Sequence, residues 1–133
     1  FPYTTLFRSI AELSSAMLSC YAAAVVEFTV APPGFTTRVP ERPATTPYVR
    51  LRAKLGSEVT NLRLENIEVT EASRLVLTHL DGEHSREDLV RLIDAWMDKT
   101  LAPAPSAEKR RERAAQYIDY ILKNFANGAL ITA

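Results

Sequence analysis

Apolar residues recur every three or four positions in four stretches of the chain, which predicts four amphipathic helices. They cover Ile10–Ala24, Glu71–Leu80, a segment that opens at Ser85, and Ala107–Phe125. A further short helix is predicted over Tyr48–Leu55, with Gly56 suited to its end. In the first of the four helices the apolar stripe consists of Ile10, Leu13, Met17, Cys20, Tyr21 and Ala24. Each stripe has to be buried against another element, so each helix is expected to contribute one face to a core.

The last three helices carry the clearest signals. Their core faces are predicted to hold Ala72, Leu75, Val76 and Leu80, then Leu89, Ile93, Trp96, Met97 and Leu101, and finally Ala114, Ile118, Ile121, Leu122 and Phe125. Thr70 is suited to cap the first of the three, and Ser85 with Asp88 forms a capping-box pair for the second. Asp81-Gly82 between them predicts a tight turn.

Short strands are predicted where the pattern changes to alternation or to β-branched residues. These stretches are Val25–Val30, Leu64–Val69 and Ala129–Thr132. Between the first two lies Ala31–Pro47, which is rich in proline and threonine. Because proline lacks an amide donor and fixes its own backbone, this stretch is expected to be an extended linker at a domain boundary.

Taken in order, the elements predict a mainly α (α+β) fold. A strand, two helices joined by a tight turn, a third helix and a closing strand indicate a winged-helix or helix-turn-helix-like domain with short strands over residues 48–133. Residues 10–30 are then expected to be the end of a preceding domain.

The first nine residues, FPYTTLFRS, do not lead into this pattern. Codon by codon they match the translation of a widely used sequencing-adapter oligonucleotide, and the chain lacks an initiator methionine. We expect native sequence to begin near Ile10, in a fragment of metagenomic origin, and we exclude residues 1–9 from the fold.

Composition narrows the class of protein. The chain has 133 residues with 16 basic and 16 acidic side chains, so its formal net charge is zero. Such balance argues against a dedicated nucleic-acid binder. The single cysteine, Cys20, cannot form an internal disulfide, which favours a cytoplasmic protein, and its apolar surroundings predict a buried thiol. No apolar run is long enough to predict a membrane span.

The sequence contains few residues that are suited to catalysis, cofactor binding or metal binding. The four glycines stand singly, whereas a phosphate-binding or dinucleotide-binding loop needs several close together. His79 and His84 flank the Asp81-Gly82 turn, but no third ligand or nucleophile accompanies them, so we interpret both as solvent-exposed turn residues. The sequence therefore predicts no catalytic, cofactor-binding or metal-binding residue in this chain.

One basic cluster, residues 108–113, could contact nucleic acid or an acidic partner. Its interleaved Glu108 and Glu112 favour a solvated, salt-bridged helix face instead. The helix after the tight turn, which would enter a DNA groove, carries acidic residues including Asp94 and Asp98, and these would oppose phosphates. Trp96 and Tyr120 are interpreted as core residues.

Several short motifs resemble one family. They are Glu41-Arg42-Pro43 with Pro47, Val59-Thr60-Asn61-Leu62-Arg63 with Glu65, and Leu80-Asp81-Gly82 followed by Ser85-Arg86-Glu87-Asp88-Leu89. Together they are similar to the tail of bacterial S-adenosylmethionine-dependent methyltransferases that carry a methyltransferase regulatory domain, a group that includes protein-lysine methyltransferases.

The resemblance implies a C-terminal winged-helix domain, with residues 10–30 as the end of the regulatory domain. The cofactor-binding domain would lie upstream, so S-adenosylmethionine belongs to the parent protein. Expected partners are the upstream domains and a protein substrate. Positions with a structural or interface role are Arg42, Asn61, Arg63, Asp81, Gly82 and Trp96. Two other hypotheses stay open, a stand-alone winged-helix DNA-binding regulator and a peptide-binding chaperone module.

Overall fold

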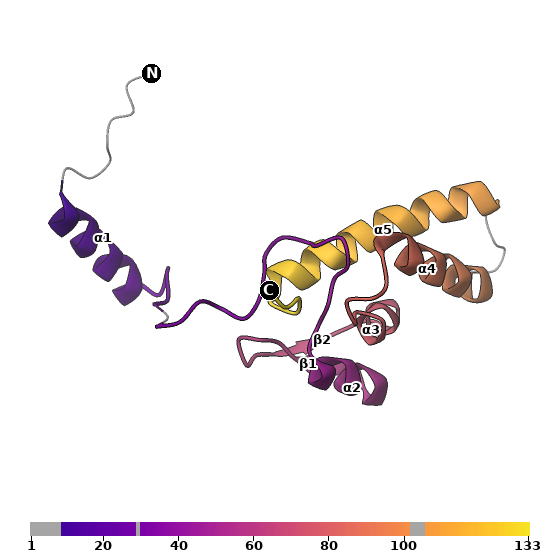
Figure 1. Cartoon of the computed structure of the whole chain (residues 1–133), viewed down its shortest axis with the longest axis horizontal. Helices are drawn as coiled ribbons and strands as arrows, with labels where there is room; N and C mark the ends of the chain where they lie inside the picture. Colours follow the sequence, from indigo (N-terminus) through magenta and orange to yellow (C-terminus); the bar gives the residue numbers. More distant parts are fainter. Residues whose placement is uncertain (1–8, 29, 102–105) are drawn as a thin grey trace, which may run out of the picture. The chain divides into compact units, whose positions relative to one another are not determined.

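The computed structural model describes residues 9–28, 30–101 and 106–133. The chain forms two compact units, residues 1–33 and 34–133, which are considered separately (Figure 1). The stretch interpreted as adapter-derived lies outside the described residues except for Ser9. Positions 102–105 of the predicted link between the last two helices also lie outside them.

The first unit contains one helix, α1 (Ile10–Ala22), capped by the Ser9 side chain, which accepts a hydrogen bond from the Glu12 amide at 3.2 Å. The predicted helix is confirmed and ends at Ala22. Its apolar stripe is uncovered within this unit, and Ile10 is 84% exposed. Cys20 is half-buried, so the expected full burial of its thiol is wrong.

The predicted strand Val25–Val30 is wrong for its described residues, since none of positions 25–28 and 30 lies in a strand. A strand needs a neighbour that pairs its backbone amides and carbonyls, and the described part of this unit supplies none. Instead, the Phe28 ring stacks on Tyr21 with their centroids 5.2 Å apart.

The second unit contains the other elements. In chain order they are α2 (Pro47–Leu55), β1 (Glu58–Thr60), β2 (Asn66–Glu68), α3 (Glu71–Thr78), α4 (Arg86–Thr100) and α5 (Ala107–Asn127). The two strands form an antiparallel hairpin in which Val59 pairs with Ile67. Figure 1 shows α4 running alongside α5, with α3 and the hairpin between this pair and α2. The mainly α class with short strands is confirmed.

Each helix of this unit except α5 begins at a side-chain cap. Thr46 and Thr70 accept hydrogen bonds from the amides of Val49 and Ser73, at 3.2 and 3.3 Å. Ser85 and Asp88 form the predicted capping box, with the Ser85 amide donating to the Asp88 carboxylate at 2.9 Å. These caps fix the helix starts because they satisfy amides that have no partner within the helix.

The core is built from one face of α3, α4 and α5 together with α2 and the hairpin. Its largest fully buried side chains are Leu77, Leu80, Leu89, Ile93, Ile118, Leu122, Leu130, Ile131, Val49, Val59 and Val76. The predicted core faces are confirmed, with Leu75, Trp96 and Met97 only partly buried. Leu101 is exposed, because it lies just beyond the end of α4 at Thr100.

Two strand predictions need correction. The stretch Leu64–Val69 forms a shorter strand, because Leu64 has a positive φ of 65° and belongs to the hairpin turn. The stretch Ala129–Thr132 forms no strand: Ala129 has a φ of 54°, and only Thr132 makes an isolated bridge, to Phe35. A backbone in the left-handed region cannot continue a regular ladder.

The second half of the proline-rich stretch packs onto this unit. Pro43 and Thr45 are buried, and the Thr45 amide donates to the Leu80 carbonyl at 2.9 Å. Further along, the Thr132 amide donates to the Ala44 carbonyl at 2.9 Å. The segment therefore joins the α3–α4 turn to the C-terminal residues.

Candidate functional site

The segment before α2 forms hydrogen bonds with the turn between α3 and α4 and holds it in place. Arg42 Nη1 donates to the Glu83 carbonyl at 2.8 Å, and the Gly82 amide donates to the Pro43 carbonyl at 3.3 Å. Gly82 has a φ of +85°, a conformation that L side chains rarely adopt. Three of the predicted positions, Arg42, Asp81 and Gly82, are thus brought together in one clamped turn.

Asp81 organises this turn electrostatically. Its carboxylate accepts hydrogen bonds from the amides of Glu83 and His84, at 2.9 and 3.2 Å, and lies 2.9 Å from His84 Nδ1. The hydrogen bond with His84 holds the pKa of Asp81 well below its usual range, with the two amides adding to the effect and burial opposing it. The turn is therefore built around an ionised carboxylate.

The two histidines are half-buried rather than fully solvent-exposed, and the His84 side chain is still 40% exposed. Their rings meet edge to face with centroids 5.4 Å apart, and His79 Nδ1 lies 2.9 Å from the Leu75 carbonyl. The rings pack on each other and on the turn because α3 ends at the first and α4 begins just after the second. Within the described ranges, no group of three or more metal-ligating side chains is arranged around an ion.

We expect Asp81→Asn to lower stability at pH 7 and to flatten the loss of stability in acid. A carboxyl whose pKa is depressed by folding contributes stability that is fully present above its unfolded pKa, about 3.9, and is lost as pH falls through and below that value. Urea unfolding at several values between about pH 7 and pH 3 would measure this. Parallel pH profiles for the variant and the parent chain would contradict it.

A second cluster surrounds Asn61 in the hairpin loop. Asn61 Nδ2 donates to Glu65 Oε2 at 2.8 Å and to the Gly128 carbonyl at 2.9 Å. Its Oδ1 accepts from the amides of Arg63 and Glu65, at 3.0 and 2.9 Å. The Arg63 guanidinium lies over the Phe35 ring, 5.0 Å from its centroid. Asn61 and Arg63 therefore join the hairpin loop to the end of α5 and to the segment before α2.

The sixth predicted position, Trp96, lies apart from both clusters. It is half-buried on α4 and lines a shallow depression together with Ala53, Arg74 and Leu75 of α2 and α3. Tyr120 was expected in the core, but it is 63% exposed on α5. The correction follows from helix geometry, because Tyr120 falls outside the face that Ile118, Ile121 and Phe125 bury.

The charged start of α5 pairs with α4 rather than along its own helix. Arg110 donates to Asp94 at 2.6 Å and also to Asp98. No ion pair among the described residues involves Glu108 or Glu112, so the predicted salt bridges within the helix are wrong. Asp94 and Asp98 therefore share the single positive charge of Arg110, and they are not the unpaired carboxylates that the sequence suggested would face DNA.

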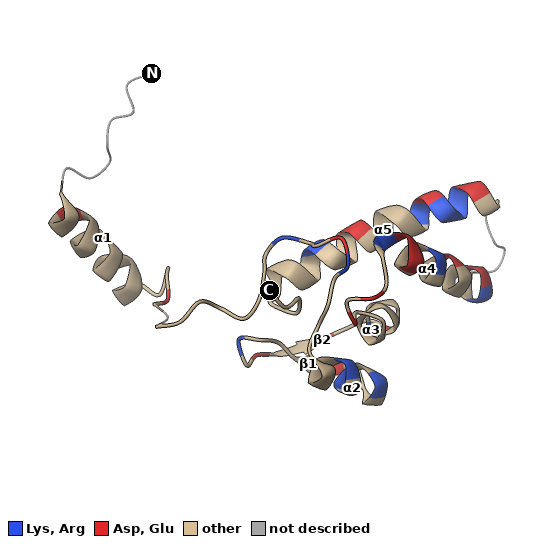
Figure 2. Cartoon of the chain, in the orientation of Figure 1, with Lys and Arg blue, Asp and Glu red and all other residues tan. Residues whose placement is uncertain are grey.

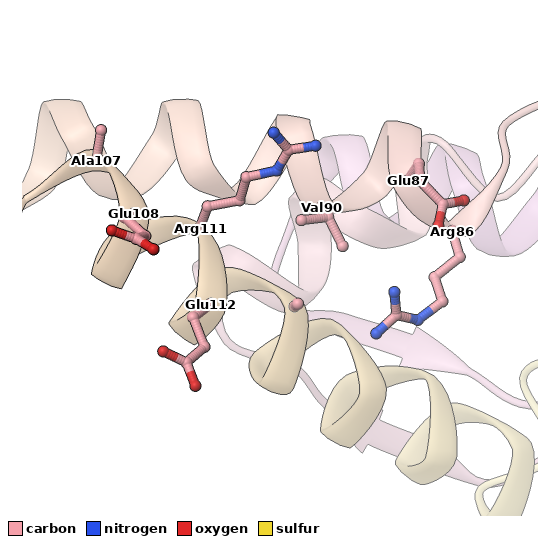
Figure 3. A pocket seen from close by; sticks show the side chains of 8 residues that line it. Arg86, Glu87, Val90, Ala107, Glu108, Arg111 and Glu112 are labelled. Carbon is pink, nitrogen blue, oxygen red and sulfur yellow. The ribbon is translucent and has the colours of Figure 1, made fainter.

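An open groove of about 540 Å³ runs between α4 and α5 beyond these pairs. Figure 3 shows Arg86 of α4 and Arg111 of α5 with Val90 between them, and Glu87, Glu108 and Glu112 nearby. Arg86 also binds Asp119 through two hydrogen bonds of 2.7 Å, which hold the pKa of that carboxyl below its usual value. The groove thus mixes both charges, as the colouring of α4 and α5 in Figure 2 shows.

A smaller and more enclosed pocket of about 270 Å³ was not foreseen from the sequence. It is lined by Ile67, Glu68, Val69, Thr70, Ser73, Tyr117, Tyr120, Ile121, Asn124, Phe125, Gly128 and Leu130. Its floor is apolar, and the two tyrosines give it polar groups. The only sequence signal was an aromatic pair, Tyr117 and Tyr120, at helical spacing.

Among the described residues, no helix has the length and apolar character needed to cross a bilayer.

Comparison with known proteins identifies a matching family and similar solved structures. Residues 41–130 match the family described as "PKMT, C-terminal winged helix domain". The structure of PKMT2 from Rickettsia typhi matches with a TM-score of 0.82 and 18% identity, over 92% of this chain and 26% of that protein. The same protein in complex with AdoHcy matches with a TM-score of 0.79, 18% identity and the same 92% and 26% coverage. No curated protein sequence matches significantly.

At this identity the structural likeness shows the fold alone, and the family match confirms the predicted winged-helix class. The family resemblance drawn from the sequence motifs is confirmed by the match over residues 41–130. The chain spans only 26% of the length of PKMT2.

Proposed function

Because this chain belongs to the family of PKMT C-terminal winged helix domains, we propose that it is the non-catalytic accessory end of an S-adenosylmethionine-dependent protein methyltransferase. In this role it positions a protein substrate or stabilises the enzyme through contacts between domains. S-adenosylmethionine binds to the upstream part of the parent protein. The parent is a bacterial, cytoplasmic enzyme, in keeping with the single cysteine.

The family match over residues 41–130 is the observation that carries this proposal. The related protein PKMT2 has a structure in complex with AdoHcy, and the region similar to this chain is 26% of it. The remaining length leaves room for a separate cofactor-binding domain. The described residues offer clamped turns and grooves, which suit binding and orientation of a partner.

The predicted positions take the following parts in this role. Arg42, Asp81 and Gly82 keep the α3–α4 turn in one conformation, so that α4 is presented at a fixed angle. Asn61 and Arg63 hold the hairpin against the end of α5. Trp96 offers an aromatic surface between α2, α3 and α4, where a neighbouring domain could pack.

The charge distribution favours this role over DNA binding. Both charges are present at the exposed start of α5 (Figure 2), and in the α4–α5 groove Glu87, Glu108 and Glu112 lie beside Arg86 and Arg111. Acidic side chains mixed in this way oppose phosphate binding. Retention on a DNA column at low salt that falls steeply as salt rises would instead support a DNA-binding regulator.

The proposal is tested first by reading the gene upstream of Ile10 with long reads from the source sample. A strand, a glycine-rich loop and a helix encoded there are the expected result, since that motif cradles the cofactor. A start codon close to Ile10 with no such domain would overturn the proposal.

In the recovered full-length enzyme, we expect deletion of residues 34–133 to lower kcat/KM for a protein substrate at least about tenfold. If the domain positions substrate, the Kd for S-adenosylmethionine stays within about twofold, because the cofactor site lies elsewhere. Calorimetry would measure this Kd and also verify that the remaining protein is folded. A joint loss of cofactor binding would assign the domain to stabilisation, and unchanged kcat/KM would exclude both roles.

A further inference from the structure

The outer edge of β2 is open for pairing. In the hairpin register Val59 pairs with Ile67, and the flanking bonds join the Val69 amide to the Ser57 carbonyl at 2.7 Å and the Asn61 amide to the Glu65 carbonyl at 2.9 Å. Since hydrogen-bonded pairs alternate along an antiparallel ladder, the main-chain groups of Asn66 and Glu68 point away from β1. No described residue pairs with them, so they form a template for another strand.

This edge borders the enclosed pocket between β2 and α5. Ile67, Glu68 and Val69 line one side of the pocket, and Tyr117 and Tyr120 of α5 line another. The floor includes Ile121, Phe125 and Leu130, which are buried. An added strand would place alternate side chains on the Ile67 face of the hairpin, which is the face that the pocket borders. One apolar side chain of such a strand can therefore enter the pocket.

The other face of the same hairpin carries an unneutralised acidic pair. Glu58 and Glu68 are direct partners across the two strands, and both are exposed. Like charges directly opposite each other destabilise a sheet, and no ion pair among the described residues involves either of them. A cationic side chain on an added strand would lie beside Glu68 and relieve this repulsion.

We propose that the β2 edge binds an extended segment of the protein substrate, in which a lysine or arginine is followed by an apolar residue. The segment adds as a third strand, with main-chain hydrogen bonds to Asn66 and Glu68. Its basic side chain faces Glu58 and Glu68, and its apolar neighbour enters the pocket beside Tyr120. This assignment rests on the proposed accessory role for the source of the segment, whereas the binding itself is a property of this chain.

The test uses the 133-residue chain and a short fluorescein-labelled peptide of alternating lysine and valine, followed by anisotropy. We expect saturable binding, and at least about tenfold weaker binding of the matched glutamate–valine peptide. Methylation of the peptide nitrogens that face the β2 edge should abolish binding, because it removes the donors that pair with the strand. Methylation of the alternate nitrogens should have little effect.

Two charge-reversal variants distinguish peptide binding at the β2 edge from nonspecific electrostatic attraction. Glu68→Lys is expected to weaken binding of the lysine–valine peptide at least about tenfold, since it replaces attraction with repulsion. Glu108→Lys makes the same change on α5, at the groove between α4 and α5, and should leave binding unchanged. Both residues are exposed, so both variants are expected to fold, which circular dichroism would verify.

Absence of saturable binding to the parent chain, or equal effects of the two reversals, would overturn this assignment. Tight binding of the edge-methylated peptide would do the same. These outcomes are distinct from failure of the accessory role, which depends on the upstream gene and on methylation by the full-length enzyme. If peptide binding is absent while deletion of the domain still lowers kcat/KM, the accessory role stands without the β2 edge.

Discussion

Replacing Asn61 by alanine is expected to lower the free energy of unfolding by about 2–4 kcal/mol. Asn61 is only 3% exposed, and its side chain makes four hydrogen bonds, one of which reaches the Gly128 carbonyl at the end of α5. The alanine variant leaves these groups without partners in a place where water has little access. For a domain of this size the melting temperature should fall by about 10–20 °C.

Asn66→Ala is the matched control on the same hairpin. Asn66 is exposed, and its side chain accepts one hydrogen bond, from Thr60 Oγ1 at 2.9 Å. Its loss is expected to cost no more than about 0.5 kcal/mol. Thermal unfolding of both variants by circular dichroism would compare them directly, and equal shifts would show that Asn61 does not join the hairpin to α5.

Leu80→Ala is expected to destabilise the chain by about 2–5 kcal/mol. Leu80 is 0% exposed and lies two residues beyond the end of α3, immediately before the clamped turn. Truncation removes apolar contacts and leaves a cavity, and the surroundings can collapse only partly because the backbone is held. That hold comes from the Leu80 carbonyl, which accepts a hydrogen bond from the Thr45 amide at 2.9 Å.

The control for this change is Leu55→Ala at the end of α2, where the side chain is 72% exposed. It should alter stability by less than about 0.5 kcal/mol. Urea unfolding gives both values, and an unchanged slope for both variants would show that the denatured state is not affected. A cost for Leu80→Ala as small as that for Leu55→Ala would mean that Leu80 is not enclosed.

Helix content and the main core faces could be predicted from the sequence because both depend on local spacing. The Ser85–Asp88 capping box and the faces that contain Leu89 and Ile118 are properties of a single helix, and all are confirmed. Strands were harder to predict. A three-residue strand such as β1 has little pattern of its own, and whether Val25–Val30 pairs depends on a partner elsewhere.

Side-chain placement around the turn also depended on contacts that form only in the folded chain. The sequence indicated the Asp81-Gly82 turn, but the burial of its flanking histidines comes from their mutual packing. The pairing of Arg110 with Asp94 joins two helices across the link at 102–105, and spacing along one helix could not show it.

The helical register, the helix caps, the balanced charge and the motifs shared with the family can all be read from the amino-acid sequence. The folded chain was needed to see that Arg42 clamps the α3–α4 turn, that Asn61 reaches Gly128, and that a pocket lies between β2 and α5. The difference lies in how far apart along the sequence the interacting residues are. Caps and periodic faces arise from neighbours within one or two helical turns, whereas a clamp or a pocket is formed by residues distant in sequence that only the folded core brings together.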